Sequence, residues 1–458
     1  QGGPSLDAKL RLKGDWTDHL EGDKWSFRIH LKEDGQILRT RQFSIQSPDT
    51  RNFLYEWAFH KNLIQEGLLT TRYEFVNVLL NGKLLGIYAL EENFAPELIE
   101  SQGRRQGVII RFDEDLMWQN IATFWSQGIV QEGNIMVTDL ESADITVFQA
   151  SKIAEDPVLS AEAAAARGLL RAFQTGQRPA AEVFDVQQVG RFFALHDLWA
   201  ACHGVAWHNL RFYYNPVTGL LEPVAYDAEP FVWCSTEQTI IGEFTQNRLF
   251  NDPDVRAAYA RELERLTRPG YAADLQRNLA GEHDQIQKAL EVEFGGQNVG
   301  VDWERLEARS QTLRLELQPA QTVRGSYQII PAAPAEGQPA RLEIDLVNLL
   351  LLPVEVLRVE LDGQPLSISG QTVRLLPVTG KDGDVFQPVR ISVTLPEDAQ
   401  SNLEMPAVEV VTRLEGIAAE HRTRLNGSVM PEALVIGPAP AQPSLEQVLQ
   451  QHPFLSAN

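Results

Sequence analysis

Cysteine is scarce in this chain, because its 458 residues include only Cys202 and Cys234. Two cysteines exclude a disulfide-dense scaffold and a cysteine-rich zinc or iron–sulfur centre. They are compatible with two buried thiols or with one disulfide, and the sequence leaves that choice open. Long apolar runs are also missing: the best one, 346–357, is interrupted by Asn348 and Pro353 and falls short of the about 18 residues that a membrane-spanning helix needs. We therefore expect no transmembrane segment in this chain.

Positive charge is in deficit as well. Lys and Arg number 40 against 62 Asp and Glu, which gives a formal net charge of −22. Such a surface repels phosphate backbones, so we expect no nucleic-acid partner. The 43% hydrophobic fraction is that of an ordinary globular protein and excludes a largely disordered chain. At about 150 residues per domain, the length predicts about three domains.

The first hundred residues are predicted to form strands with one inserted helix. Apolar and polar residues alternate in several short runs, which is typical of half-buried antiparallel strands. Between residues 50 and 66 the apolar spacing changes to three and four, which predicts a helix. Asn81-Gly82 is a strong signal for a hairpin turn. The expected strands are 6–13, 25–31, a short one at Phe43 and Ile45, 73–80 and 84–91.

The residue pattern of the rest of the chain changes near Pro319. Before it, helical periodicity dominates, with a small β-hairpin predicted at 209–214 and 220–226. After a Pro- and Ala-rich stretch that we interpret as a loop, 329–340, short strands separated by turn residues predict a β-sandwich. The expected helices are 161–173, 186–202, 254–266, 271–294 and 302–317, and the expected late strands are 340–347, 354–361, 372–376, 389–394 and 407–414.

These patterns predict an α+β protein with an antiparallel amino-terminal sheet, a helical middle and an all-β end. We place the boundaries at 5–115, 116–320 and 321–432, followed by a tail at 433–458. The order of the predicted features is that of protein-kinase-like phosphotransferases. These features are a lysine on a strand, a glutamate on a helix, a crossover, a helical region and polar residues that flank a hairpin. The order therefore favours a two-lobe, kinase-like fold for the first two segments.

One candidate metal site lies at the predicted hairpin in the middle of the chain. Asn209 opens one strand and Asp227 ends its partner, so the two side chains are expected to lie close together. An amide oxygen and a carboxylate suit Mg²⁺ or Mn²⁺. Glu229, two residues further on, is a third candidate on the same face. The alternative is that Asn209 caps the strand and Asp227 makes an ordinary turn.

Candidate nucleotide-binding residues come from the predicted first segment. Lys24 and Arg28 share one strand face, from which a lysine can hold phosphates. Glu56, on the inserted helix, is a candidate partner for such a lysine, and Glu92 ends the fifth strand. Each has an ordinary alternative: a solvated strand face, a helix-surface acid or a charged turn.

Several motifs resemble the spore-coat protein H (CotH) kinases. The most specific match is Val78-Leu79-Leu80-Asn81-Gly82-Lys83-Leu84-Leu85-Gly86-Ile87-Tyr88-Ala89-Leu90-Glu91-Glu92. Arg11-Leu12-Lys13-Gly14 and Lys24-Trp25-Ser26-Phe27-Arg28-Ile29 resemble the opening of that family, and Arg51-Asn52 resembles its helix start. Phe193-Ala194-Leu195-His196 and Glu222-Pro223-Val224-Ala225-Tyr226-Asp227 resemble its second half, so that the likeness covers roughly residues 7–235.

The resemblance implies an atypical kinase fold that transfers phosphate from ATP, with Mg²⁺ or Mn²⁺, to Ser or Thr of secreted or surface proteins. It implies a metal-binding role for Asp227 and Asn209 and a nucleotide-site role for Glu92. Lys24 lies one position before the family lysine, where this chain has Trp25. The catalytic-loop aspartate of the family falls at or near His203, which could accept a proton at neutral pH.

Three functions remain open. The first is an active CotH-like kinase with a protein substrate. The second is a catalytically inactive kinase-fold protein that binds a partner in the cell envelope. The third is a hydrolase that uses two carboxylates from the set Asp113, Asp115, Asp227 and Glu229. The resemblance predicts an extracytoplasmic location, and because the chain starts with Gln1-Gly2 we expect that a leader preceded it.

Overall fold

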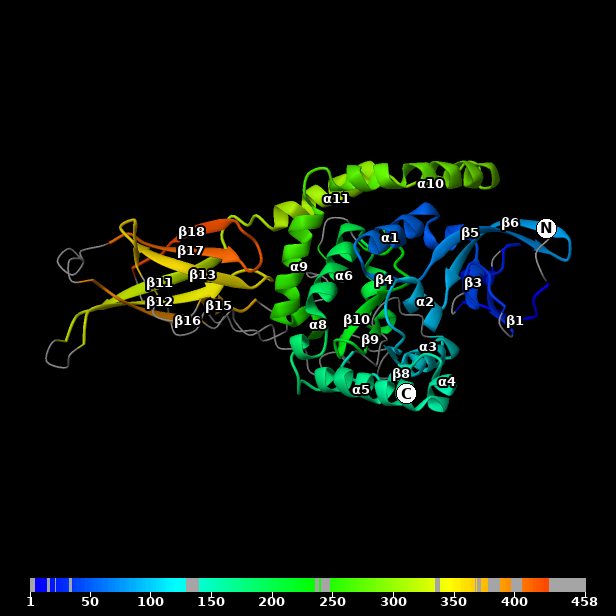
Figure 1. The fold of residues 1–458 in the computed structure, drawn as a ribbon. Helices are drawn as coiled ribbons and strands as arrows, with labels where there is room; N and C mark the ends of the chain where they lie inside the picture. Colours follow the sequence, from blue (N-terminus) through cyan, green and yellow to red (C-terminus); the bar gives the residue numbers. More distant parts are fainter. Residues whose placement is uncertain are drawn as a thin grey trace. The chain divides into compact units, whose positions relative to one another are not determined.

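The computed structural model of this protein is mixed α+β with antiparallel sheets, as the sequence predicts. It divides into two compact units, residues 1–318 and 319–458 (Figure 1). No helix in the described part of the chain combines the length and apolar composition that a membrane span requires. The predicted tail, 433–458, lies outside the described residues. The described residues are 5–14, 17–20, 22–32, 35–128, 140–234, 239, 248–333, 338–366, 368, 372–377, 388–396 and 406–427.

A five-stranded antiparallel sheet of order β1-β2-β3-β6-β5 opens the first unit. One face of this sheet is apolar and contributes to a small core. Because side chains alternate along a strand, the other face carries Arg28, Ser44 and Glu91, which are register neighbours across three strands. The sequence places both a core and a polar surface on this one sheet. Its strands are β1 Ala8–Leu12, β2 Phe27–Leu31, β3 Gln42–Gln46, β5 Tyr73–Leu80 and β6 Lys83–Glu92.

The predicted hairpin forms between β5 and β6. Asn81 and Gly82 have φ values of 52° and 81°, which are the positive values that a two-residue turn of this type requires. The inserted helix, α1 Leu54–Gln65, starts four residues later than predicted, after a 3-10 turn at Pro48–Arg51. Positive φ values at Asn52 and Phe53, 53° and 51°, are incompatible with a right-handed helix and delay its start.

A second sheet of order β4-β10-β9-β7-β8 lies in the same unit. It joins β4, which pairs parallel with β10, to the predicted hairpin β9–β10. Its members come from both sides of the predicted boundary at 115/116, so these two segments share a sheet and belong to one unit. Periodicity does not indicate this sheet, because β4, β7 and β8 are too short for a periodic pattern. The strands are β4 Leu69–Thr70, β7 Ile109–Phe112, β8 Ile145–Val147, β9 Arg211–Asn215 and β10 Leu220–Ala225.

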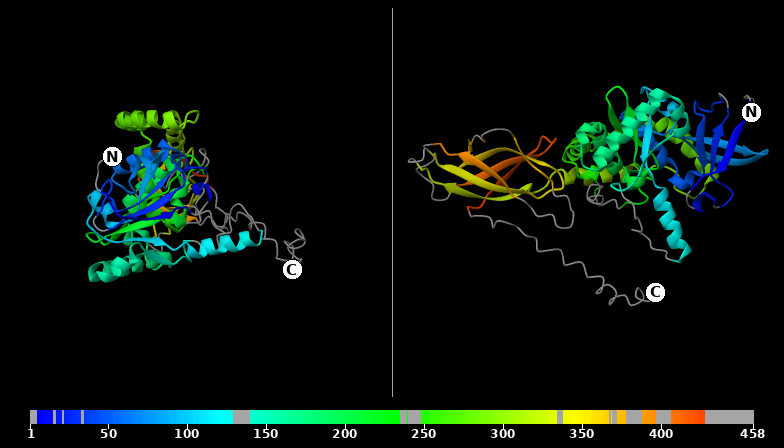
Figure 2. Two further views of the ribbon diagram at one scale, coloured as in Figure 1. Left: turned by 90° about the vertical axis from the view of Figure 1, so that its right-hand side faces the viewer. Right: turned by 90° about the horizontal axis from the view of Figure 1, so that it is seen from below.

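Helices complete the first unit. Asp156, Asp185, Asp252 and Asp302 each cap a helix by accepting hydrogen bonds from backbone N–H groups of its first turn. In Figure 2, α3 extends away from the rest of the unit, and it buries only Met117. The helices after α1 are α2 Pro96–Ser101, α3 Asp115–Ser126, α4 Ala150–Glu155, α5 Pro157–Gln174, α6 Val186–Leu198, α8 Arg248–Asn251, α9 Pro253–Leu266, α10 Tyr271–Glu293 and α11 Trp303–Glu316. Further 3-10 turns are Thr17–Leu20, Ala180–Glu182, Cys202–Val205 and Trp207–Asn209.

The second unit consists of strands in its described residues. Two sheets, β11-β12-β16 and β14-β13-β17-β18 with β15 beside β13, contribute to one apolar core. Figure 1 shows β13, β17 and β18 on one side of this unit and β11, β12 and β16 on the other. The stretch 329–340 was expected to be a loop, yet it begins inside β11, which pairs with β12 along its whole length. The strands are β11 Val323–Ile330, β12 Arg341–Asn348, β13 Val354–Leu361, β14 Gln364–Leu366, β15 Val373–Leu375, β16 Val389–Thr394, β17 Val408–Leu414 and β18 Glu420–Arg424.

Candidate functional site

The chain leaves β10 through a segment with unusual backbone geometry. Asp227, Glu229 and Phe231 have φ values of 52°, 47° and 61°. Non-glycine residues rarely adopt such values, and each costs about 1–3 kcal/mol unless the surroundings hold it. The surroundings here include Glu56, whose carboxylate accepts hydrogen bonds from the backbone N–H groups of Ala228 at 3.0 Å and Glu229 at 2.9 Å. The hydrogen bonds from Glu56 therefore fix the backbone that carries the side chains of Asp227 and Glu229.

Glu56 has a different role from the predicted one. Its side chain on α1 is fully buried, and besides the two backbone contacts it lies 3.1 Å from Nε2 of His60. The prediction that Glu56 binds nucleotide is therefore replaced by a positioning role. No local pattern indicates this role, because the hydrogen bonds join residues more than 170 positions apart.

Arg51 pairs with both acidic side chains. Its Nε lies 2.6 Å from Oδ1 of Asp227, and its Nη1 lies 3.0 Å from Oε1 of Glu229. Burial alone would raise the pKa of Asp227, but the Arg51 guanidinium and His203 hold that pKa well below its usual range. Burial raises the pKa of Glu229, with Arg51 opposing. Asp227 is thus an ionised carboxylate at neutral pH.

His203 completes a set of three groups that are able to hold a metal ion. Its Nε2 lies 3.6 Å from Oδ2 of Asp227. One ligand atom each from His203, Asp227 and Glu229 lies within 4.8 Å of the other two. Burial opposes a proton on His203, yet the Asp227 carboxylate outweighs it and raises the pKa of His203. One imidazole and two carboxylates suit Mn²⁺ and related divalent ions, so the residues fit the metal that the sequence predicts.

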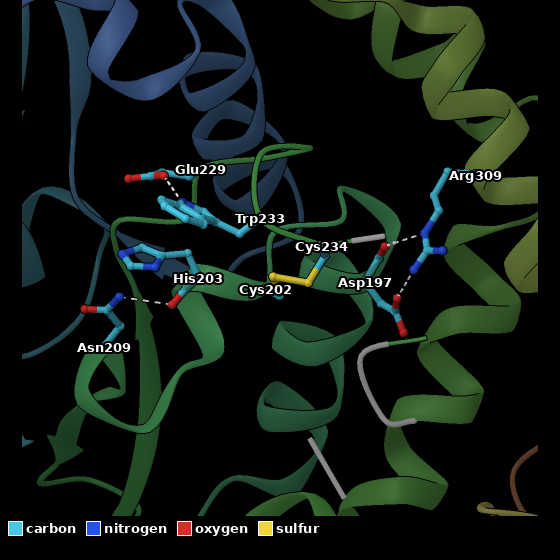
Figure 3. Close-up of a disulfide and its surroundings, with 8 residues drawn as sticks. All are labelled: Asp197, Cys202, His203, Asn209, Glu229, Trp233, Cys234 and Arg309. Carbon is cyan, nitrogen blue, oxygen red and sulfur yellow. Dashed lines mark hydrogen bonds and ion pairs between the residues drawn. A yellow bond between two sulfur atoms is a disulfide. The ribbon is translucent and has the colours of Figure 1, made fainter. Parts of the chain in front are cut away.

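Asn209 lies beside this set but does not open a strand as predicted. It ends a 3-10 turn, and β9 begins two residues later. Its side-chain amide donates a hydrogen bond to the backbone oxygen of His203 at 3.0 Å (Figure 3). Asn209 therefore fixes the turn that carries His203, and this contact leaves its amide oxygen as the atom that could face a cation.

A disulfide between Cys202 and Cys234 encloses the site residues. The bond settles the choice that the sequence left open. His203 follows Cys202 and Trp233 precedes Cys234. The rings of His203 and Trp233 stack with centroids 6.1 Å apart. Trp233 Nε1 also donates a hydrogen bond to Oε2 of Glu229 (Figure 3). The two ends of the loop that contains the metal-ligand candidates are thus held together covalently and by side-chain contacts.

A pocket of about 400 Å³ adjoins this segment. Its walls come from the polar face of the first sheet and from residues of the second sheet and α3. Lys13 Nζ donates hydrogen bonds to Oε2 of Glu91 at 2.6 Å and to Oε1 of Gln46 at 2.9 Å, and the Lys13–Glu91 pair is almost fully buried. Lys13 also helps to lower the pKa of Asp227. The lining residues are Lys13, Arg28, Ser44, Glu91, Glu92, Asn93, Phe94, Arg111, Glu114, Asp115, Trp118, Phe148, Arg211 and Tyr226.

The prediction for Lys24 is corrected by the structure. Lys24 is not among the described residues that line this pocket. Its Nζ lies 2.5 Å from Oε1 of Glu293 and donates hydrogen bonds to the backbone oxygens of Leu85 and Ile87. The lysine of the pocket is Lys13, from the motif Arg11-Leu12-Lys13-Gly14.

Arg28 and Glu92 line the pocket, whereas Asn209 and Asp227, which were predicted for the same cleft, are not among its described lining residues. Alternation along β6 nevertheless distinguishes Glu92 from its neighbour. Glu91 is in register with Ser44 and pairs with Lys13 on the polar face, whereas Glu92 is in register with Phe43 of the apolar face. Burial raises the pKa of Glu92. Glu91, not Glu92, is therefore the acid that pairs with the pocket lysine.

Arg211 is one of the residues that line the pocket. Its guanidinium lies 5.6–5.8 Å from the ring centres of Phe94, Phe148 and Tyr226. Burial lowers the pKa of Arg211 to about 10, against the attraction of Glu114. A cation held between aromatic rings is a fixed positive charge at neutral pH. The pocket thus combines two acids of the first sheet with cations from both sheets.

Neither a protein-family model nor a curated protein matches this chain. The chemical character of the site therefore has to be argued from its own residues. Lys13, Arg51 and Glu91 are the three contributors that the sequence analysis did not select. All three stand in motifs quoted for the CotH resemblance, which is the one signal that could have identified them.

Proposed function

We propose that the protein binds ATP with Mg²⁺ or Mn²⁺ between the lobes of a kinase-like fold. We further propose that it transfers phosphate to Ser or Thr of secreted or surface proteins, as the CotH kinases do. One observation carries the proposal: the buried Lys13–Glu91 pair lines a pocket whose wall includes Tyr226, the residue before Asp227, and Lys13 helps to lower the pKa of the Asp227 carboxyl. A lysine held by a glutamate and a metal-binding aspartate are the two charged elements that phosphotransferases require.

The roles follow from the charge of each group. Lys13, Arg28 and Arg111 are pocket cations that would bind the phosphates. Asp227, Glu229 and His203 would hold the divalent ion, which offsets the charge that develops on a transferred phosphoryl group. Glu56 would keep the carboxylates of Asp227 and Glu229 in place, because it accepts hydrogen bonds from the backbone N–H groups of this segment. The volume of about 400 Å³ lies within the range of small-molecule sites.

A second candidate is a kinase-fold protein that binds nucleotide, or an envelope partner, without phosphotransfer. His203 favours it, because this histidine stands at or near the place of the family's catalytic-loop aspartate and lies 3.6 Å from Asp227. The hydrolase alternative has less support, because Arg51 pairs with both Asp227 and Glu229 and leaves neither as a free acid or base. The disulfide favours an oxidising, extracytoplasmic location for either candidate.

Two measurements test the proposal in sequence. Calorimetric titration with ATP and Mn²⁺ should give one site in the unmodified protein, and Asp227→Asn should abolish it. Incubation with labelled ATP, Mn²⁺ and a Ser-rich acceptor protein should then give transfer. His203→Ala removes one of the three proposed metal ligands, so it should weaken Mn²⁺-dependent ATP binding, and any transfer should fall at least as much. Binding without transfer would favour the second candidate, and the absence of binding would contradict both.

A further inference from the structure

We propose that Arg51 is a built-in competitor of the divalent cation: its guanidinium occupies the Asp227 and Glu229 carboxylates, and it has to move before a metal ion can bind both. This inference rests on the proposed metal site but concerns a residue to which that proposal assigns no role. Arg51 is 7% exposed and sits at the end of the 3-10 turn that precedes α1. It is therefore held against the site by the fold and is not a surface side chain that happens to reach it.

The contacts of Glu229 carry the argument. Oε1 of Glu229 lies 3.0 Å from Nη1 of Arg51, and Oε2 accepts a hydrogen bond from Trp233. Both oxygens are thus engaged. A metal ion binds a carboxylate oxygen at about 2.0–2.6 Å, so it would have to displace one of these two donors.

Asp227 distinguishes between the two donors. Oδ1 of Asp227 lies 2.6 Å from Nε of Arg51, in a contact that lacks hydrogen-bond alignment, while Oδ2 lies 3.6 Å from His203. A divalent ion bound to Asp227 and Glu229 together would share oxygens with the guanidinium, and the two cations would repel each other at contact distance. Trp233 is neutral and does not oppose the ion in this way. Arg51 is therefore the group with which the metal competes.

An alternative acceptor for Arg51 is present nearby. Oε1 of Glu91 is buried and accepts no hydrogen bond from the described residues. Glu91 also contributes to the raised pKa of Arg51, after the larger contributions of burial, Asp227 and Glu229. A shift of the guanidinium toward Glu91 would free the carboxylates and keep the arginine paired. The Arg51 guanidinium would then lie next to the Lys13–Glu91 pair.

The test is Mn²⁺ binding without nucleotide, measured by electron paramagnetic resonance for the unmodified protein and for Arg51→Gln. Removal of the competitor should tighten Mn²⁺ binding at least tenfold. Arg51→Gln should also melt at a lower temperature in chelator and regain stability with Mn²⁺, because the ion replaces the lost positive charge. Arg309→Gln is the matched control: it removes the arginine of another buried ion pair in this unit, with Asp197, and should lower the melting temperature without any Mn²⁺-dependent recovery.

The outcomes separate this inference from the proposed function. If the unmodified protein binds Mn²⁺ and Arg51→Gln binds it equally or more weakly, Arg51 supports the site and the inference fails while the metal site stands. If neither protein binds Mn²⁺, the metal site and the inference both fail. Binding by Arg51→Gln alone would establish the competition. Should Arg51→Gln not fold, Arg51→Lys, which keeps the charge but cannot reach both carboxylates, should bind Mn²⁺ more tightly than the unmodified protein, and unchanged or weaker binding would overturn the inference.

Discussion

The two compact units carry their charges in different ways. The first unit buries ion pairs such as Lys13–Glu91, with side chains 6% and 4% exposed. In the described ion pairs of the second unit the arginine is partly exposed: Arg390 and Asp345 are register partners on β16 and β12, and the Arg390 side chain is 64% exposed. Exposed pairs are screened by water and salt, whereas a buried charge that loses its partner has no solvent to replace it. Sensitivity to charge changes should therefore be concentrated in the first unit.

The tryptophans allow this comparison to be measured. All nine lie before residue 304, within the first unit. Tryptophan fluorescence therefore follows the unfolding of the first unit alone, and calorimetry follows both units. A change in the first unit should therefore shift both signals, and a change in the second unit should shift the calorimetric signal alone.

The largest effect should come from Lys13→Met. The change leaves the Glu91 carboxylate buried and removes its 2.6 Å partner, so the first unit should lose about 3–5 kcal/mol of stability. Urea unfolding followed by tryptophan fluorescence measures the loss. A loss below about 1 kcal/mol would show that water reaches Glu91 and would remove the contrast between the units.

Loss of the disulfide should be the next largest effect. Cys202 and Cys234 are separated by 32 positions, and a closed loop of that length stabilises a fold by about 3–4 kcal/mol in the chain-entropy model. The double change Cys202→Ala with Cys234→Ala should lower the stability of the first unit by that amount. It should also weaken Mn²⁺ binding, because His203 and Glu229 lie within the loop. A reductant should reproduce both effects in the unmodified protein and leave the double variant unaffected.

A smaller effect is expected on acidification. Burial lowers the pKa of His196 to about 3, and its side chain is fully buried in α6. Because this value lies below the ordinary 6.5, the unfolded chain takes up the proton first as the pH falls, and the stability contribution is lost below about pH 6.5. Between pH 7.5 and 5 the loss is about 2 kcal/mol. His196→Gln should remove this part of the pH dependence in urea unfolding, and an unchanged slope would contradict the assignment.

The smallest effect should come from Arg390→Ala in the second unit. The exposed pair with Asp345 has two N–O distances of 2.8 Å, yet such pairs contribute only about 0–1 kcal/mol. The calorimetric transition should shift little, and the shift should vanish at high salt. A larger, salt-independent loss would show that the surface pairs of the second unit matter as much as the buried pairs of the first.

Local patterns were sufficient for much of the fold. The alternation around Ile29 and the turn residues Asn81-Gly82 depend on neighbours in sequence, so the amino-terminal strands could be predicted. The start of α1 could not, because positive φ at Asn52 and Phe53 depends on packing: Asn52 donates a hydrogen bond to the backbone oxygen of Pro230. Of the second sheet only the hairpin was predicted, because β4 and β7 join it through pairs of residues about 100 to 155 positions apart.

The site was predicted in part for similar reasons. Asp227 ends a recognisable strand, and His203 follows from the motif register, so both could be selected. Lys24 and Lys13 are equally plausible from sequence, and only strand pairing decides which one meets Glu91. Burial and long-range pairing determine the function of a charged residue here, and neither can be read from its immediate neighbours.

The central claim is that the pocket beside Asp227 binds a metal–nucleotide complex. The most direct measurement is a calorimetric titration of ATP with Mn²⁺ into the unmodified protein, Asp227→Asn and Arg390→Ala. The account predicts one binding site in the unmodified protein, its loss in Asp227→Asn and no change in Arg390→Ala. Absence of binding to the unmodified protein, or equal binding by Asp227→Asn, would contradict it.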